Sequence, residues 1–172
     1  MIKNKEMTFQ YQKSRKVIEV LNDLVSIQND RIAGYQQALG RLINIDSDLH
    51  EEFENIILDS YQFRQELLQK LKELNGSSKT YTPILGKIYR AWMDLKITFS
   101  GNSQKAIIGW CHYNEEIALH AYKAALNISE EMPQAIRQLI EKQEVELKKI
   151  YDQVQTYREI RHVVDYRVLY LA

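Results

Sequence analysis

Apolar residues recur along most of this chain at alternating steps of three and four. That spacing is typical of helices that bury one face in a bundle. Four such stretches predict long helices over residues 14–42, 48–74, 103–127 and 132–162. The first stretch shows the pattern most fully, at positions Ile18, Leu21, Val25, Gln28, Ile32, Tyr35, Leu39 and Leu42.

A shorter apolar repeat lies between the second and third stretches. It follows a loop-forming run at residues 75–80, opens at Pro83 and predicts a fifth helix over residues 83–99. Two helical hairpins joined by one long crossover have the connectivity of ferritin-like folds. We therefore predict an all-α fold: a ferritin-like antiparallel four-helix bundle with a short extra helix in the long crossover between helices two and three.

The two ends of the chain differ from the predicted bundle, residues 14–162. Residues 1–13 are polar and predict a flexible N-terminal arm, whereas residues 163–172 form an apolar C-terminal tail that we expect to pack on this chain or on a partner. The first sixteen residues carry one acidic side chain, Glu6, against five basic ones: Lys3, Lys5, Lys13, Arg15 and Lys16. This run leaves open a DNA-associated role beside the simpler interpretation of a solvated start.

Charge and composition narrow the function classes. The 172 residues suit one domain, and 23 Lys and Arg balance 23 Asp and Glu, which argues against a general attraction to nucleic acid or anionic membrane. The start lacks the apolar core of a signal peptide, and no run reaches the ~18 apolar residues of a membrane span. Cys111 is the single cysteine, which excludes an intrachain disulfide and fits a reducing compartment. We therefore expect a cytoplasmic protein.

Several segments together resemble a known family. They are LNDL at 21–24, NDRIAGY at 29–35, RAWMDLK at 90–96, GN at 101–102, AII at 106–108, CHYNEE at 111–116 and AYKAAL at 121–126. The chain resembles a member of the ferritin-like superfamily and, more narrowly, a bacterial family of four-helix-bundle proteins known only as a domain of unknown function. The resemblance implies the bundle, the crossover and an association with stress, but no established reaction. Members often have an acidic residue where this chain has His112.

The middle of each long apolar stripe bears on whether the bundle holds a metal site. Di-iron carboxylate bundles take a Glu from each of two helices and a Glu-x-x-His from each of the other two. Here the stripe centres are neutral: Gln28, Ser60, Asn114 and Gln143. The literal Glu-x-x-His at 159–162 stands at a helix end without a second copy. We predict no ferritin-type site, no catalytic residue and no cofactor, and interpret the four residues as a structural polar layer that fixes helix register.

A second candidate for a metal site lies on the third long helix. His112, Glu116 and His120 recur every four residues, with Glu115 adjacent. His and carboxylate at this spacing can bind a divalent metal ion on a helix face. The alternative interpretation is a solvated face beside the apolar stripe.

These observations favour a non-enzymatic helical bundle with a structural, stress-associated or protein-interaction role. The alternative is a metal-binding protein or oxidoreductase with an atypical site, and the second alternative is a DNA-associated bundle that uses the basic arm. The apolar tail and the tyrosine-rich faces need covering, so we expect a homo-oligomer, with a dimer favoured. The sequence leaves any protein partner open.

Overall fold

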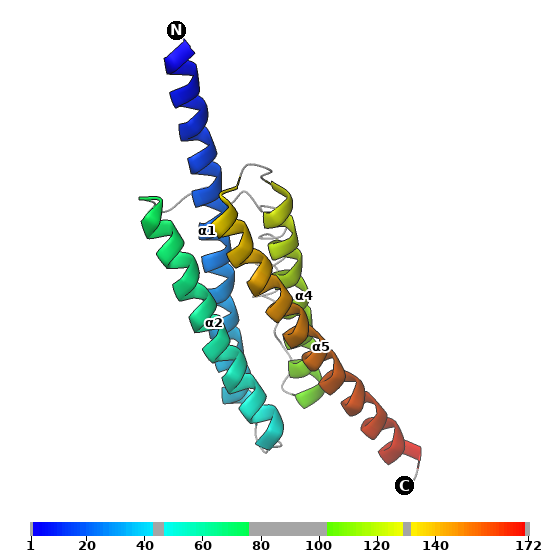
Figure 1. The fold of residues 1–172 in the computed structure, drawn as a ribbon. Coiled ribbons are helices and arrows are strands. Elements are labelled where there is room, and N and C mark those ends of the chain that lie inside the picture. The colour runs from blue at the N-terminus through cyan, green and yellow to red at the C-terminus, as the bar shows by residue number, and fades with distance from the viewer. Residues whose placement is uncertain (1, 43–46, 76–102, 129–131, 171–172) are drawn as a thin grey trace.

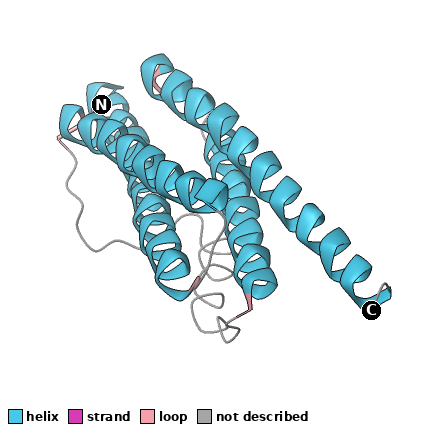
Figure 2. Ribbon diagram, turned by 90° about the horizontal axis from the view of Figure 1, so that it is seen from below, coloured by secondary structure: helices cyan, strands magenta, loops and turns pink. Residues whose placement is uncertain are grey.

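The chain forms four long helices in a computed structural model, which describes residues 2–42, 47–75, 103–128 and 132–170. They are α1 (Ile2–Arg41), α2 (Ser47–Glu73), α4 (Gln104–Ile128) and α5 (Gln134–Tyr170) (Figure 1). The described part of the chain contains no strand (Figure 2). The predicted all-α bundle is therefore confirmed, whereas the predicted crossover helix at 83–99 lies outside the described residues.

Side-chain contacts between the helices give their directions. Arg64 of α2 donates to Asn29 of α1, while Tyr35 of α1 packs edge-on against Phe53 of α2. Residue numbers therefore rise along one helix as they fall along the other, and the two helices are antiparallel. The same reasoning makes α4 and α5 antiparallel, and likewise α1 and α4. Two antiparallel hairpins packed in this way form the ferritin-like bundle.

The first and last helices are longer than the sequence pattern predicted. Residues 2–13, predicted to be a flexible arm, form the start of α1, and residues 163–170 of the predicted tail continue α5. Neither stretch contains Pro or Gly, so nothing in the backbone chemistry stops the helix where the apolar stripe fades. Both ends project beyond the other helices (Figure 1).

Local chemistry marks several other helix boundaries. The Ser103 hydroxyl accepts from the Ala106 amide at 3.2 Å and caps α4, as an N-cap serine does. Pro133 precedes α5, and its carbonyl accepts the first helical amide bonds, from Ile136 and Arg137. After α2, Asn75 adopts a φ of 53°, in the left-handed region that asparagine tolerates at helix C-termini. No helix in the described residues is long and apolar enough to cross a membrane.

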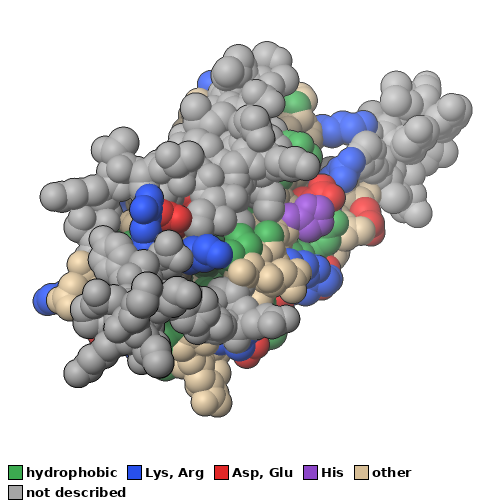
Figure 3. Space-filling view, turned by 90° about the horizontal axis from the view of Figure 1, so that it is seen from above, with side chains coloured by type: hydrophobic (Ala, Val, Ile, Leu, Met, Phe, Trp, Pro, Cys, Tyr) green, Lys and Arg blue, Asp and Glu red, His purple; other side chains and the backbone are tan. Residues whose placement is uncertain are grey.

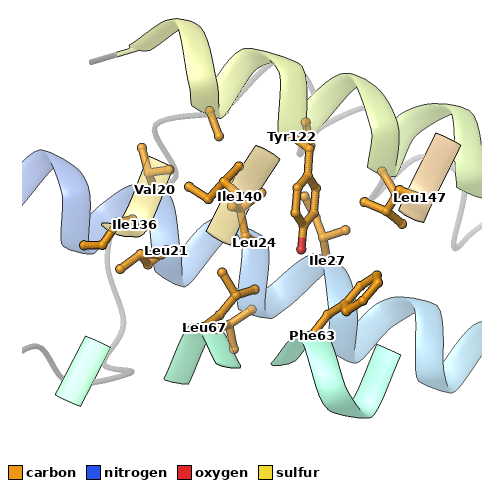
Figure 4. Packing of buried hydrophobic residues seen from close by; sticks show 14 of the residues in the cluster. Val20, Leu21, Leu24, Ile27, Phe63, Leu67, Tyr122, Ile136, Ile140 and Leu147 are labelled. Carbon is orange, nitrogen blue, oxygen red and sulfur yellow. The ribbon is translucent and has the colours of Figure 1, made fainter. Parts of the chain in front are cut away.

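The apolar core divides into two parts. The Leu21 cluster fills one part of the bundle (Figure 4) and consists of Val17, Val20, Leu21, Leu24, Val25, Ile27, Phe63, Leu67, Leu71, Ala118, Leu119, Ala121, Tyr122, Ala125, Met132, Ile136, Ile140 and Leu147. The Tyr35 cluster fills the other and consists of Tyr35, Ala38, Leu49, Phe53, Ile56, Ile107, Ile108, Cys111, Ile150 and Val154. Along α1, α2 and α4, buried polar residues separate the two clusters.

Candidate functional site

An ion pair without solvent exposure lies between the two apolar clusters. Arg31 of α1 donates from Nε to Oε1 of Glu115 at 3.0 Å, and from Nη2 to Oε2 at 2.9 Å. Both side chains are 0% exposed. This two-pronged geometry is the strong form of an Arg–carboxylate contact, and each charge depends on the other for compensation.

The remaining N–H donors of Arg31 bond to a third helix, α2, as well as to α1. Its Nη1 donates to Gln28 Oε1 of α1 at 2.9 Å and to Ser60 Oγ of α2 at 2.9 Å. The Ser60 hydroxyl in turn donates to the Ile56 carbonyl one turn earlier, at 2.6 Å. The guanidinium therefore links α1, α2 and α4 directly.

A chain of hydrogen bonds extends this network to α5. Gln28 Nε2 donates to the Tyr122 hydroxyl at 2.8 Å, and that hydroxyl donates to Gln143 Oε1 at 2.8 Å. Gln143 Nε2 then donates to Glu66 Oε2 at 2.8 Å and to the Phe63 carbonyl at 3.2 Å. We call the connected residues Gln28, Arg31, Ser60, Glu115, Tyr122 and Gln143 the polar layer. Each of the four described helices contributes to it.

The four neutral residues singled out in the sequence are all buried, but they do not all meet. The structure brings Gln28, Ser60 and Gln143 into one network. Asn114 instead donates from Nδ2 to the Trp110 carbonyl of its own helix at 2.7 Å. In the described residues, this bond within α4 is the one that the Asn114 amide makes, so Asn114 is not part of the network.

The apolar stripes did not place the two charged members of the polar layer in the core, and Glu115 was noted only as a neighbour of the His112 row. A signal for them exists at heptad spacing: Arg31 stands midway between buried Leu24 and Ala38, and Glu115 midway between buried Ile108 and Tyr122. A helix in a four-helix bundle faces two neighbours, so its buried face is wider than one stripe. Stripes drawn with one residue per turn left both residues out.

The electrostatics of the layer keep the Arg31 guanidinium charged and the phenols neutral. Burial acts to lower the pKa of Arg31, but Glu115, Tyr35 and Tyr122 together act against it, and the pKa is raised. Burial also raises the pKa of Tyr122, of Tyr35 and of the Cys111 thiol. The phenols and the thiol therefore keep their protons near neutral pH.

The structure does not bring His112, Glu116 and His120 of α4 together as a metal site. His112 is buried, and its Nδ1 lies 3.3 Å from Nη1 of Arg158, while its ring packs on Tyr151 with centroids 4.8 Å apart. Burial lowers the pKa of His112, and Arg158 lowers it further. Glu116 is half-buried and His120 is exposed. Within the described residues, no group of three His, Cys, Asp or Glu side chains could hold a metal ion.

Two solved structures share the fold. A mutant of Dps1 from Mycobacterium smegmatis has a TM-score of 0.73 and 16% identity, covering 86% of this chain and 97% of that one. The bacterioferritin-related protein of Bacteroides fragilis, described as a dodecameric thioferritin, has a TM-score of 0.72 and 14% identity, covering 98% and 99%. At these identities the likeness shows the fold alone. The preference for a dimer is contradicted, because the Bacteroides fragilis structure with this fold is dodecameric, a larger assembly than two chains.

The ferritin-like fold raises the question of whether the polar layer suits a pair of metal ions. The layer supplies one carboxylate, Glu115, whose two oxygens are both engaged by Arg31. Its other polar groups are two amides, a serine hydroxyl and a protonated phenol. Carboxylates that bridge and neutralise two cations are missing from this set, and a guanidinium brings positive charge instead. The donor set of the layer does not fit a di-iron centre.

Sequence comparison places the chain in a family. No curated protein sequence matches it. The family described as "Domain of unknown function (DUF2383)" matches residues 16–128. This range covers α4 and most of α1 as well as α2, and so contains both Arg31 and Glu115. On that match, this chain belongs to the DUF2383 family of the ferritin-like fold.

Proposed function

We propose that this chain is a non-enzymatic ferritin-like bundle that acts as the subunit of a larger homo-oligomer and works through protein contacts. The observation that carries the proposal is the Arg31–Glu115 pair at the centre of the bundle. Reactive metal centres in helix bundles need inward-pointing ligands with room for a substrate. Here the inward-pointing groups of the polar layer are bonded to one another.

The remaining candidate groups support a structural role. Cys111 is buried, and burial raises the pKa of its thiol, which disfavours the nucleophilic thiolate. His112 packs against a tyrosine and a guanidinium, surroundings that favour a structural histidine over a metal ligand.

The assembly part of the proposal follows the neighbours of the same fold. The Bacteroides fragilis protein is dodecameric, and its fold matches this chain over nearly all its length. We therefore propose a closed homo-oligomer of more than two chains, in the cytoplasm, with a stress-associated role suggested by the family resemblance. In the face seen in Figure 3, basic and acidic described side chains lie side by side, which suits protein contacts.

Two measurements on untagged protein test the proposal. Light scattering coupled to size exclusion should give a mass well above twice the 20.3 kDa chain, and ferrous iron should oxidise no faster with the protein than in buffer. A monomer at high protein concentration would refute the assembly. Accelerated iron oxidation with near-stoichiometric bound metal would favour the metal-binding alternative. Loss of that activity in His112→Gln, but not in His50→Gln, would place such a site on the α4 row.

A further inference from the structure

The guanidinium of Arg31 lies in a cage of oxygen atoms. Glu115 Oε1 and Oε2, Gln28 Oε1 and Ser60 Oγ each accept from it at 2.9 to 3.0 Å. These oxygens come from α1, α2 and α4. Carboxylate, amide and hydroxyl oxygens that converge from different elements are the ligand types that hard cations take in proteins.

The cage has one negative charge that needs a positive partner. A buried carboxylate without compensation is costly, and in the described residues Arg31 is the cation bonded to Glu115. The guanidinium nitrogens therefore occupy the place that a bound cation would fill. They hold the cage oxygens of three helices together, as a structural metal ion does.

We propose that the guanidinium of Arg31 is the built-in cation of this bundle, and that Glu115, Gln28 and Ser60 form a latent cation site which Arg31 keeps filled. The ligand class of the vacated site is a small cation with oxygen ligands: a free guanidinium ion, or a divalent metal when a second carboxylate is supplied. The inference concerns this one cage. It does not depend on the assembly or on the protein contacts proposed above.

The first test vacates the cage. Arg31→Ala removes the guanidinium, and thermal unfolding is then followed with about 10 mM guanidinium chloride or with the same concentration of KCl. This concentration is far below that at which guanidinium unfolds proteins. If the ion occupies the cage at many times its Kd, the Tm of the variant should rise by about 5–10 °C over KCl. The wild type should shift by less than about 1 °C.

A matched variant separates filling of the cage from a general effect of the ion. Leu67→Ala removes another fully buried side chain, in the Leu21 cluster, and leaves the Arg31–Glu115 pair in place. It should lose stability through its cavity but gain nothing from guanidinium. Equal rescue of both variants would overturn the proposal.

The second test changes the charge of the cage. Arg31→Glu places a carboxylate opposite Glu115, and the two charges together suit a divalent ion. In EDTA, the variant should unfold at a lower temperature than the wild type. Addition of about 1 mM MnCl₂ should raise the Tm of the variant by about 5–10 °C, with no comparable rise in the wild type. A variant that folds only with its cation supports the proposal. If neither variant gains stability or refolds with its cation, the proposal is wrong.

Discussion

The Leu21 cluster and the Tyr35 cluster lie in the same four helices but treat buried polar atoms differently. Each contains one fully buried tyrosine. The Tyr122 hydroxyl of the Leu21 cluster accepts from Gln28 and donates to Gln143, both at 2.8 Å. The Tyr35 hydroxyl has no hydrogen-bond partner of accepted geometry in the described residues, although burial, the charge of Glu115 and a looser hydrogen bond with that carboxylate all raise its pKa.

The difference extends to the neighbours of the two tyrosines. His112, next to Cys111 of the Tyr35 cluster, also buries a ring nitrogen, Nε2, that has no hydrogen-bond partner in the part of the chain that the structure describes. An unsatisfied buried polar atom costs about 1–3 kcal/mol. We infer that Tyr35 and the neighbouring His112 carry polar atoms whose burial works against stability, whereas the Tyr122 hydroxyl of the Leu21 cluster is satisfied.

The largest expected effect comes from breaking the layer between the clusters. Glu115→Ala leaves the guanidinium of Arg31 buried without a partner, and we expect a loss of about 3–5 kcal/mol in the free energy of unfolding. Urea denaturation measures it. The double variant Arg31→Met with Glu115→Leu removes both charges and keeps the volume, so it should unfold with a much smaller loss. A single variant that costs less than about 1 kcal/mol would mean that Arg31 reaches water or another anion.

The two tyrosines provide the most direct test of the comparison. Tyr122→Phe leaves Gln28 and Gln143 each short of a partner inside the core, and should cost about 1–3 kcal/mol. Tyr35→Phe removes a hydroxyl that has no hydrogen-bond partner of accepted geometry in the described residues, so it should be neutral or stabilise by up to about 1 kcal/mol. Denaturant titrations of the two variants, side by side, measure the difference. Equal losses would show that the Tyr35 hydroxyl is bonded in solution, and the contrast between the clusters would disappear.

The fold could be predicted from the sequence because the patterns that indicate it are local. Alternating steps of three and four place apolar side chains on one helix face, and helix breakers separate the stretches. The ends of α1 and α5 could not be predicted from that pattern, because a helix without a breaker can continue where the apolar stripe has already ended. Where Pro and Gly are absent, the position at which a helix ends depends on tertiary contacts, and a local sequence pattern does not reveal them.

The polar layer could be predicted only in part, for a related reason. The stripe placed Gln28 on the inner face of α1, but it did not show that the next residue along that face, Arg31, is buried as well. A buried Arg becomes acceptable once a carboxylate lies opposite it, and here that carboxylate is 84 positions away in the sequence. Pairing across helices depends on register in three dimensions. One sequence without its relatives does not provide that register.

A smaller effect is expected where α1 and α4 approach each other beside the Tyr35 cluster. A Cβ atom at Gly34 would lie 2.4 Å from Cη2 of Trp110, so Gly34→Ala forces the indole or the helix to move. We expect a net loss of about 1 kcal/mol, since overpacking outweighs the gain in helix propensity. Gly109→Ala is the matched control, because its Cβ would meet nothing within 4 Å. It should gain up to about 1 kcal/mol, and equal effects of the two variants in thermal unfolding would refute the close approach.

The smallest expected effect is a pH dependence at His112. Its native pKa is lowered by burial and by Arg158, although Glu116, Glu159 and Glu115 act in the opposite direction. Below the ordinary histidine pKa of about 6.5, the unfolded chain binds a proton that the native state resists, so this residue makes stability fall as the pH drops. Stability measured between about pH 7.5 and pH 5.5 should show this decline.

His112→Gln separates this contribution from that of the carboxylates. Glutamine does not titrate, so the variant should lose less stability than the wild type over the same pH range. Arg158→Gln should have an intermediate slope, because it removes one of the two causes that lower the pKa and leaves burial in place. An unchanged slope in His112→Gln would mean that the ring gains its proton in the native state as readily as in the unfolded chain. The Nε2 atom of His112 would then have an acceptor in solution, and the contrast between the two clusters would rest on the tyrosines alone.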